Sequence, residues 1–337
     1  MVSGMVSGAL FSCPSCHVEC GQDWKQCPSC LFPLQRVDGR YRLFQNIGEG
    51  SAGRLFLAED LQENEECALK TLHPELFEQK EVEVRFWREI RVTRQLSSLS
   101  KHIIQLLDYG NDEYYGYYYT MEYLEGQTLQ EFVEEQSQVS YTTLFGLLKP
   151  LFEVVHLVHE EGVLHRDLSP KNVFLVKQSD GSFLLKLLDF GVAKALEGTL
   201  HSQLTNGALG TPGYIAPEQW RGEAVDAKSD QYALGVLVYK LLVGSPPFEN
   251  EGDSFLSIMK LMHQHLEEPA PSLCDVRPEL HLPSSLNVVV QKALSKDPGM
   301  RYPSVAAFWD ALSVYAGLER TRIAPTLVPE DPNATLF

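Results

Sequence analysis

The order of predicted strands and helices limits the fold more than any other feature of this 337-residue sequence. Alternating apolar and polar residues predict five strands before Gly126, at residues 41–47, 54–59, 66–71, 103–109 and 114–123. One predicted helix, at residues 75–96, interrupts them, and beyond Gly126 helices dominate, notably at residues 141–161 and 230–242. The sequence therefore predicts an α+β fold, with a small antiparallel sheet followed by a mainly helical part.

Composition and charge limit the class of protein. The chain is 44% hydrophobic and 22% charged, which suits a globular protein with a sizeable core. Its formal net charge of −17 argues against nucleic acid as a partner, since phosphate binding needs clustered Lys and Arg. No uninterrupted apolar stretch is long enough to cross a membrane, and the first ten residues lack the basic start of a signal peptide. We expect a cytoplasmic protein without a membrane segment in this chain.

Two C-x-x-C units separated by ten residues predict a zinc site formed by Cys13, Cys16, Cys27 and Cys30. Disulfides or incidental thiols are the alternatives, but a cytosolic chain disfavours disulfides and the matched pairs disfavour chance. His17 and Cys20 lie close enough to compete as ligands, although the symmetrical pairs already supply four thiolates. A closed four-thiolate shell leaves no open position, so we expect a structural Zn²⁺ in a ribbon over residues 13–34.

A glycine-rich segment carries the first sign of catalytic chemistry. Gly48, Gly50 and Gly53 lie between two predicted strands, where backbone N–H groups can close over a polyphosphate. A strand follows rather than a helix, which favours a flap over ATP rather than a dinucleotide site. Lys70 ends an otherwise apolar strand and needs an anionic partner, for which Glu89 on the predicted helix is suited.

Three further motifs follow in order: HRDLSPKN at residues 165–172, DFG at 189–191 and GTPGYIAPE at 210–218. With the glycine segment and Lys70, they make the chain from about Arg40 to Leu318 resemble the eukaryotic-like (Hanks-type) serine/threonine kinases of bacteria. The resemblance implies a two-lobed protein kinase fold behind the zinc ribbon. The implied organisation is a flexible N-terminus at 1–12, the ribbon at 13–34, a kinase domain at 40–318 with lobes at 40–121 and 125–318, and a flexible tail at 319–337.

The resemblance also implies the roles of individual residues in phosphoryl transfer to protein Ser or Thr. Lys70 would hold the α- and β-phosphates and be oriented by Glu89, Asp167 would accept or orient the substrate hydroxyl proton, and Lys171 would steady the transferred group. Asn172 and Asp189 would bind Mg²⁺ or Mn²⁺. The implied ATP contacts are Ile47, Gly48, Gly50, Gly53, Leu55, Ala68, Lys70, Met121, Glu122 and Leu124.

Other residues are implied to support the site. Glu218 and Arg301 resemble a buried ion pair of the family, and Asp230 is expected to anchor the catalytic loop. Lys171, together with Thr211 in the segment that holds the substrate, resembles serine/threonine rather than tyrosine kinases.

Regulation is predicted at the activation loop. Arg166 precedes the catalytic aspartate, and in the family such an arginine binds a phosphate on that loop. We expect autophosphorylation at Ser202 or Thr205, with Thr199 as a further acceptor.

The departures from the family pattern are small. Leu55, Cys67 and Leu69 are apolar replacements of tolerable shape, and Cys67 is interpreted as a core residue rather than a redox switch. The tyrosine-rich run at residues 114–119 is interpreted as packing. The alternative to an enzyme is a pseudokinase-like scaffold that acts through the ribbon, for which a protein partner is possible.

Overall fold

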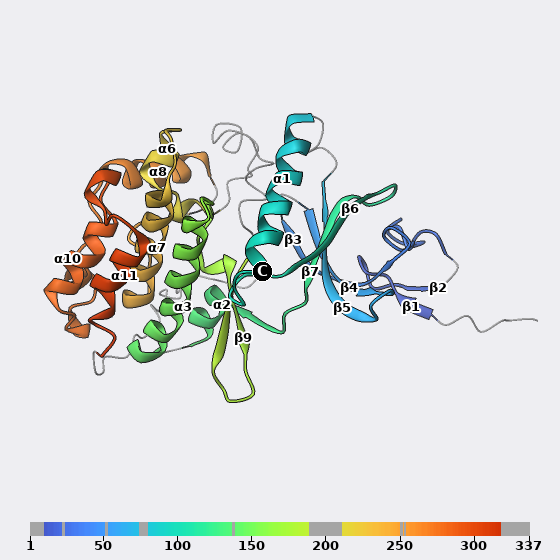
Figure 1. The fold of residues 1–337 in the computed structure, drawn as a ribbon, viewed down its shortest axis with the longest axis horizontal. Coiled ribbons are helices and arrows are strands. Elements are labelled where there is room, and N and C mark those ends of the chain that lie inside the picture. Colours follow the sequence, from blue (N-terminus) through green and yellow to red (C-terminus); the bar gives the residue numbers. More distant parts are fainter. Residues whose placement is uncertain are drawn as a thin grey trace, which may run out of the picture. The chain divides into compact units, whose positions relative to one another are not determined.

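The structure is a computed structural model that describes residues 10–21, 24–50, 53–73, 80–136, 139–188, 211–249, 252 and 254–317. The chain forms two compact units that divide between Glu125 and Gly126 (Figure 1). The first unit contains the sheet and the cysteine-rich segment, and the second contains most of the helices. The α+β fold class predicted from the order of strands and helices is confirmed.

The first unit is built on a five-stranded antiparallel sheet in the order β3-β4-β5-β7-β6. Its strands are β3 (Tyr41–Gly50), β4 (Gly53–Asp60), β5 (Glu65–Leu72), β6 (Leu106–Asp112) and β7 (Gly116–Glu122). β6 begins at Leu106 rather than at the predicted residue 103. Ile103 and Ile104 are buried outside the strand, so their apolar side chains resemble a strand in sequence.

The two faces of this sheet are covered by different partners. Helix α1 (Lys80–Ser97) packs Phe86 against Tyr117 and Tyr119, with ring centroids 6.1 and 6.4 Å apart. Side chains alternate along a strand, so Phe56 and Leu69, which pair in register across β4 and β5, face the other way from Lys70. That second face belongs to the hydrophobic cluster shared with the cysteine-rich segment.

The cysteine-rich segment, residues 10–21 and 24–37, is called the ribbon below. It begins with β1 (Leu10–Ser12), which pairs antiparallel with β2 (Glu19–Gly21). The prediction of a flexible N-terminus up to residue 12 is therefore wrong for residues 10–12, whose backbone pairs with that of β2. The Phe32 ring lies 5.5 Å from that of Phe56 on β4. The ribbon and the sheet thus share one hydrophobic core.

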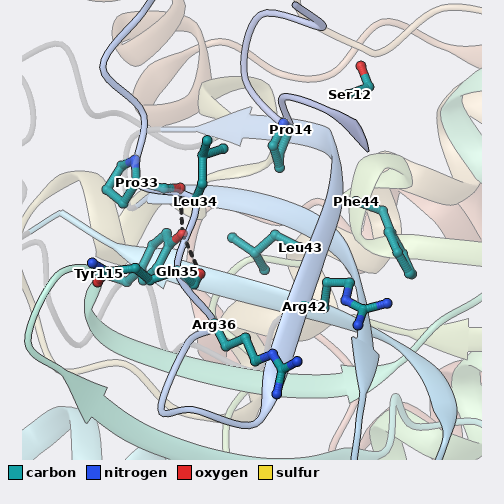
Figure 2. Close-up of a pocket in the computed structure, with 10 residues that line it drawn as sticks. All are labelled: Ser12, Pro14, Pro33, Leu34, Gln35, Arg36, Arg42, Leu43, Phe44 and Tyr115. Carbon is teal, nitrogen blue, oxygen red and sulfur yellow. Dashed lines mark hydrogen bonds between the residues drawn. The ribbon is translucent and has the colours of Figure 1, made fainter. Parts of the chain in front are cut away.

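Hydrogen bonds along the seam between ribbon and sheet come from two tyrosines of the predicted packing run. The Tyr115 hydroxyl donates to the carbonyl oxygens of Pro33, at 2.7 Å, and Gln35, at 3.0 Å (Figure 2). The Tyr118 hydroxyl donates to Asp38 Oδ2 at 2.9 Å. Both rings are buried, so this run does pack as predicted, and its hydroxyls also fix the chain that leaves the ribbon.

The second unit is mainly helical, as predicted. Its α-helices are α2 (Leu129–Glu135), α3 (Tyr141–Glu160), α6 (Pro217–Trp220), α7 (Ala227–Val243), α8 (Phe255–Glu267), α9 (Leu273–Val276), α10 (Ser284–Ala293) and α11 (Val305–Ser313). Most residues of α7 are buried, so it forms the centre of the unit, and α3, α10 and α11 pack around it. It ends at Gly244, whose φ of +91° suits a residue without a Cβ.

A small sheet in the second unit was not predicted. It has the order β10-β9-β8, with β8 (Gly126–Thr128), β9 (Val173–Lys177) and β10 (Phe183–Leu187). The three antiparallel strands are only three to five residues long, and β9 opens with a continuous apolar run. Such short runs show no clear alternation, which explains why the sequence did not reveal them.

Helix α3 is long and apolar enough to cross a membrane by length and composition alone. Ten of its residues, including Leu151 and Phe152, are nevertheless buried in the second unit. The apolar composition of α3 is therefore explained by its place as the core helix of a folded domain.

Candidate active site

The catalytic loop of the second unit is held by one buried carboxylate. Asp230, near the start of α7, accepts hydrogen bonds from the backbone N–H groups of His165 and Arg166, each at 2.8 Å. Arg166 has a φ of +66°, a conformation that non-glycine residues rarely adopt. The two bonds to Asp230 compensate for that strain, so the predicted anchoring role of Asp230 agrees with the geometry.

His159 on α3 is a partner of Asp230 that the sequence did not reveal. Its Nε2 lies 2.8 Å from Asp230 Oδ2. Burial opposes ionisation of Asp230, but the hydrogen bond and charge of His159 and the groups of His165 lower the pKa of Asp230 overall. The anchor is thus a charged acceptor. No motif marks His159, because its role depends on α3 lying beside α7.

Asp167, the predicted catalytic residue, is oriented within its own loop. Asn172 Nδ2 donates to Asp167 Oδ2 at 2.9 Å and to the Asp167 carbonyl oxygen at 2.7 Å. Asn172 is itself fixed because its carbonyl oxygen accepts from the Leu188 N–H at 2.9 Å. The half-buried carboxylate of Asp167 therefore has a defined direction. Such positioning is what general base catalysis requires.

The structure brings Thr211 to the same loop. Its Oγ1 donates to Ser169 Oγ at 3.3 Å, two residues before the exposed Lys171. Lys171 lies in the 3-10 turn η2 (Pro170–Asn172), between Asp167 and β9. Thr211, Lys171 and Asp167 thus belong to one local arrangement in the second unit.

Glu218 and Arg301 form the predicted buried ion pair. Two parallel bonds of 2.7 and 2.8 Å join the guanidinium to the carboxylate, and the side chains are only 3% and 0% exposed. Ser229 Oγ donates to Glu218 Oε1 at 2.6 Å, a contact the sequence did not reveal. Burial opposes ionisation of Glu218, but the hydrogen bonds and charge of Arg301 lower its pKa overall.

In the first unit, the strand register places four of the predicted ATP contacts on one face of the sheet. Lys70 pairs with Leu55 of β4 and Tyr119 of β7, and Ala68 pairs with Met121. Because Lys70 and Ala68 are two residues apart on β5, their side chains point to the same face. Lys70 is half-buried, and its Nζ lies 5.8 Å from the centroid of the Tyr119 ring.

The glycine-rich segment spans the turn from β3 to β4. Gly48 pairs with Leu55, and Gly50 pairs with Gly53. A Cβ at Gly53 would lie 1.8 Å from the carbonyl oxygen of Thr71, so no other residue fits there without movement of the backbone. Gly48 and Gly50 meet no such obstacle, and their need for glycine is not explained by packing.

Glu122, a predicted ATP contact at the end of β7, has its backbone donor already in use. The Glu122 N–H donates to the Gln105 carbonyl at 3.0 Å, and Glu122 Oε1 accepts from the Gln105 N–H at 2.7 Å. The Glu122 N–H is therefore engaged within the first unit. Two further predicted ATP contacts are Leu124, which lies shortly after β7, and Ile47, which is exposed on β3.

Several predicted site residues lie outside the described part of the chain. These are Asp189 and the acceptors Thr199, Ser202 and Thr205, and also the predicted tail. The backbone of Glu89 lies in α1, but its side chain is not described. The predicted Lys70–Glu89 pair therefore stays a prediction.

The four cysteines of the two C-x-x-C units converge in the ribbon. Their sulfur atoms all lie within 4.8 Å of one another, with Cys13 and Cys30 3.7 Å apart and Cys16 and Cys27 3.5 Å apart. Sulfur atoms at the corners of a zinc tetrahedron, with bonds of about 2.3 Å, lie about 3.8 Å apart. The separations fit that geometry. Cys20 stands outside the group and donates to the Val18 carbonyl.

One of these thiols is poised to ionise. Burial opposes ionisation of Cys27, but the backbone N–H groups of Cys30 and Ser29 and the thiols of Cys16 and Cys13 lower its pKa to about 6. The pKa values of its neighbours Cys13 and Cys16 are raised instead, so within this cluster Cys27 is the thiol that ionises most readily. Cys67, by contrast, is buried under the ribbon, and its burial raises the pKa of its thiol to about 12.

Comparison with known proteins places the chain in a family. A protein kinase domain matches residues 41–309. Serine/threonine-protein kinase Pkn1 of Myxococcus xanthus is 34% identical over 329 residues, covering 95% of this chain and 46% of that protein. PknB of Mycolicibacterium smegmatis is 34% identical over 292 residues, covering 84% and 44%. The chain spans less than half the length of these curated relatives.

A solved structure supports the same assignment. The kinase domain of PknI from Mycobacterium tuberculosis is 26% identical and superposes with a TM-score of 0.64, covering 85% of this chain and 98% of that domain. The predicted two-lobed kinase fold is therefore confirmed. This chain belongs to the protein kinase family, and the two curated relatives to which it is similar are serine/threonine-protein kinases of bacteria.

Proposed function

We propose that this chain is a protein kinase that transfers the γ-phosphoryl group of ATP to Ser or Thr hydroxyls of proteins, with Mg²⁺ or Mn²⁺. One observation carries the proposal: the Asp167 carboxylate is held by Asn172 in a loop that buried Asp230 fixes through two backbone bonds. Phosphoryl transfer asks a protein mainly for such positioning. The names of the relatives support the same activity.

The loop offers the groups that the reaction needs. Asp167 would accept the proton of the attacking hydroxyl. The hydroxyl oxygen would bond to the γ-phosphorus while the bond between that phosphorus and ADP breaks. Asn172 uses its Nδ2 for Asp167, and within the described residues no group donates to its Oδ1. That oxygen suits a hard cation, which would neutralise phosphate charge when bound. Asn172 therefore fits its predicted metal-binding role, which it would share with Asp189.

The acceptor class follows from residues near the loop. Lys171 and Thr211, which contacts Ser169 in the same loop, resemble the corresponding residues of serine/threonine rather than tyrosine kinases, and this resemblance supports Ser or Thr as the acceptor. Autophosphorylation at Ser202 or Thr205 belongs to the same proposal, with the exposed Arg166 as a binding group for the phosphate. Active protein without phosphate on these two residues would contradict this part.

The ribbon is proposed to bind one structural Zn²⁺ through Cys13, Cys16, Cys27 and Cys30. The sulfur separations support this assignment. Because the ribbon shares its core with the sheet, the ion would stabilise the first unit as a whole. A protein partner for the ribbon stays a proposal, and no contact with nucleic acid or membrane is proposed.

The test is incorporation of phosphate from labelled ATP in the presence of magnesium, followed by mass spectrometry of the modified residues. We expect phosphate on Ser and Thr, on the chain itself and on a generic basic protein, and its loss in Asp167→Asn. Folded protein that binds ATP and transfers no phosphate would contradict the proposal.

A further inference from the structure

A pocket of about 540 Å³ lies where the ribbon meets the edge strand β3 (Figure 2). Ribbon residues such as Pro14, Leu34 and Arg36 form one side, and Arg42, Leu43 and Phe44 of β3 contribute to the other. β3 is the edge of its sheet, so residues from both of its faces reach the pocket. None of the predicted ATP contacts lines it. Its volume lies within the range of about 300 to 1,000 Å³ typical of small-ligand sites.

The pocket is formed by contacts that exist without a ligand. The Asn46 N–H on β3 donates to the Pro14 carbonyl at 2.9 Å. The Tyr115 hydroxyl, which also lines the pocket, holds the carbonyls of Pro33 and Gln35. These bonds fix the ribbon backbone on two sides of the space, so a ligand would pay little to organise it.

The charged donors of this pocket are two arginines, which lie beside the polar side chains of Ser12, Gln35 and Tyr115. Within the described residues, neither Arg36 nor Arg42 donates a side-chain hydrogen bond. Arg42 Nη1 lies 3.3 Å from Glu59 Oε2, a buried oxygen that accepts no hydrogen bond among the described residues, so Arg42 also balances the charge of Glu59. The Arg42 side chain is 51% exposed, so about half of it remains accessible to a ligand.

The charge of the lining is the reverse of that of the chain. Asp and Glu outnumber Lys and Arg by 45 to 28 in the whole sequence, yet the lining has two arginines and no carboxylate, and Glu59, beside Arg42, is the one acidic residue paired with them among the described residues. The remaining walls combine the apolar side chains of Pro14, Pro33, Leu34, Leu43 and Phe44 with the polar ones of Ser12, Gln35 and Tyr115. In Figure 2 both arginines are drawn below Leu43 and away from Pro14. The lining therefore combines an apolar compartment with donors for an oxyanion.

We propose that this pocket binds a small organic anion, a carboxylate or phosphate monoester attached to an apolar body. The oxyanion accepts from Arg36 and Arg42, and the apolar body covers Leu34, Leu43 and Phe44. Guanidinium groups match both oxyanions, so the two head groups are alternatives of one chemistry. This site is separate from the proposed nucleotide site and does not depend on the chain being an active kinase.

The test uses the full chain loaded with zinc and isothermal titration calorimetry with 4-phenylbutanoate and with phenyl phosphate. We expect saturable one-to-one binding of at least one probe with a Kd below about 1 mM. The neutral 4-phenylbutanamide and free inorganic phosphate should bind at least about tenfold more weakly, because each lacks one half of the recognised chemistry. Which probe binds more tightly identifies the head group.

Variants locate the site. Arg36→Gln and Arg42→Gln should each weaken binding about five- to tenfold, since a hydrogen bond to a charged group is lost at an exposed position that tolerates glutamine. The matched control is Arg94→Gln, at an exposed arginine of α1 that does not line the pocket. Saturating MgATP should leave the affinity unchanged. Absence of saturable binding, equal binding of the amide, equal effects of all three variants, or competition with MgATP would each overturn the proposal.

Discussion

The catalytic loop and the seam between ribbon and sheet are both fixed by side chains distant in sequence, but with different chemistry. The loop relies on buried charge, with Asp230 binding two backbone N–H groups and the imidazole of His159. The seam relies on aromatic packing and on the hydroxyls of Tyr115 and Tyr118. Removing a partner of Asp230 from the catalytic loop leaves a buried charge unpaired. Removing a tyrosine hydroxyl from the seam leaves only a neutral carbonyl or an exposed carboxylate without its donor.

That difference explains what each region contributes. Buried charge allows few arrangements, so it suits a loop whose carboxylate must point in one direction. The aromatic contacts of the seam bury a wide apolar area and join the ribbon and the sheet into one core. The proposed metal site and the buried Glu218–Arg301 pair should therefore be the most sensitive points of their units, and the seam hydroxyls the least.

Zinc removal should have the largest effect. In zinc-finger peptides metal binding contributes about 10 to 16 kcal/mol of apparent folding free energy, and this ribbon shares a core with the sheet. Cys27→Ser should abolish stoichiometric zinc, measured by atomic absorption, and lower the Tm of the full chain by more than about 5 °C. The control is Cys274→Ser, outside the four-thiol group. Unchanged melting after loss of the metal would mean that the ribbon does not support the sheet.

Breaking the buried ion pair comes next. Arg301→Met leaves Glu218 buried without its bidentate partner and should lower the free energy of unfolding by about 3 to 5 kcal/mol in urea titrations. Arg221→Met, which removes an exposed pair with Glu223, should cost less than about 1 kcal/mol. The double variant Glu218→Gln/Arg301→Met should recover part of the loss, since no charge is stranded. Equal effects of the two arginine variants would contradict this account.

The same pair predicts a pH dependence. The pKa of Glu218 is lowered in the folded chain from its usual 4.5, despite its burial. Its stabilising contribution is thus fully present above that value and lost as pH falls through it toward the folded-state pKa. Unfolding free energies measured between about pH 7 and about pH 3.5 should therefore fall more steeply for the wild type than for Glu218→Gln/Arg301→Met. Parallel curves would exclude Glu218 as a source of acid sensitivity.

The smallest effects are expected at the seam. Tyr115→Phe removes the donor for two carbonyl oxygens and should cost about 1 to 2 kcal/mol of unfolding free energy. Tyr118→Phe should cost about 1 kcal/mol, because Asp38 is exposed and water can replace the hydroxyl. The matched control is Tyr114→Phe in the same run, at an exposed position, with an expected change below about 0.5 kcal/mol. A loss at Tyr114 as large as that at Tyr115 would show that the hydroxyl bonds do not matter.

Much of the fold could be predicted because its strands and helices are long and periodic. β3, β4, β5, β7, α3 and α7 all overlap their predicted ranges. The short strands β8, β9 and β10 could not be predicted, since three to five residues carry little periodicity. β1 lies before the first cysteine, in a stretch without a strand signal, and becomes a strand through pairing with β2.

The residues of the candidate site also divide into those that the sequence predicted and those that it did not. Asp167, Asn172 and Glu218 lie in motifs, and the family resemblance implied Arg301 as the partner of Glu218. The structure joins Asp167 to Asn172 and Glu218 to Arg301. His159 and Ser229 have no such signal, because their contacts depend on how helices pack. Nor could the sequence show that the ribbon covers the sheet, since its contacts are apolar residues such as Phe32, without a recognisable pattern.

The most direct test of the proposed kinase activity measures MgATP binding and phosphoryl transfer in the same samples of wild type, Asp167→Asn and Asp180→Asn. Asp180 is an exposed aspartate between β9 and β10 and serves as the matched control. We predict that Asp167→Asn keeps its affinity for MgATP within about threefold and loses transfer by at least about a hundredfold, while the control keeps both. Transfer that survives in Asp167→Asn, or is absent from the wild type, would contradict the proposed activity.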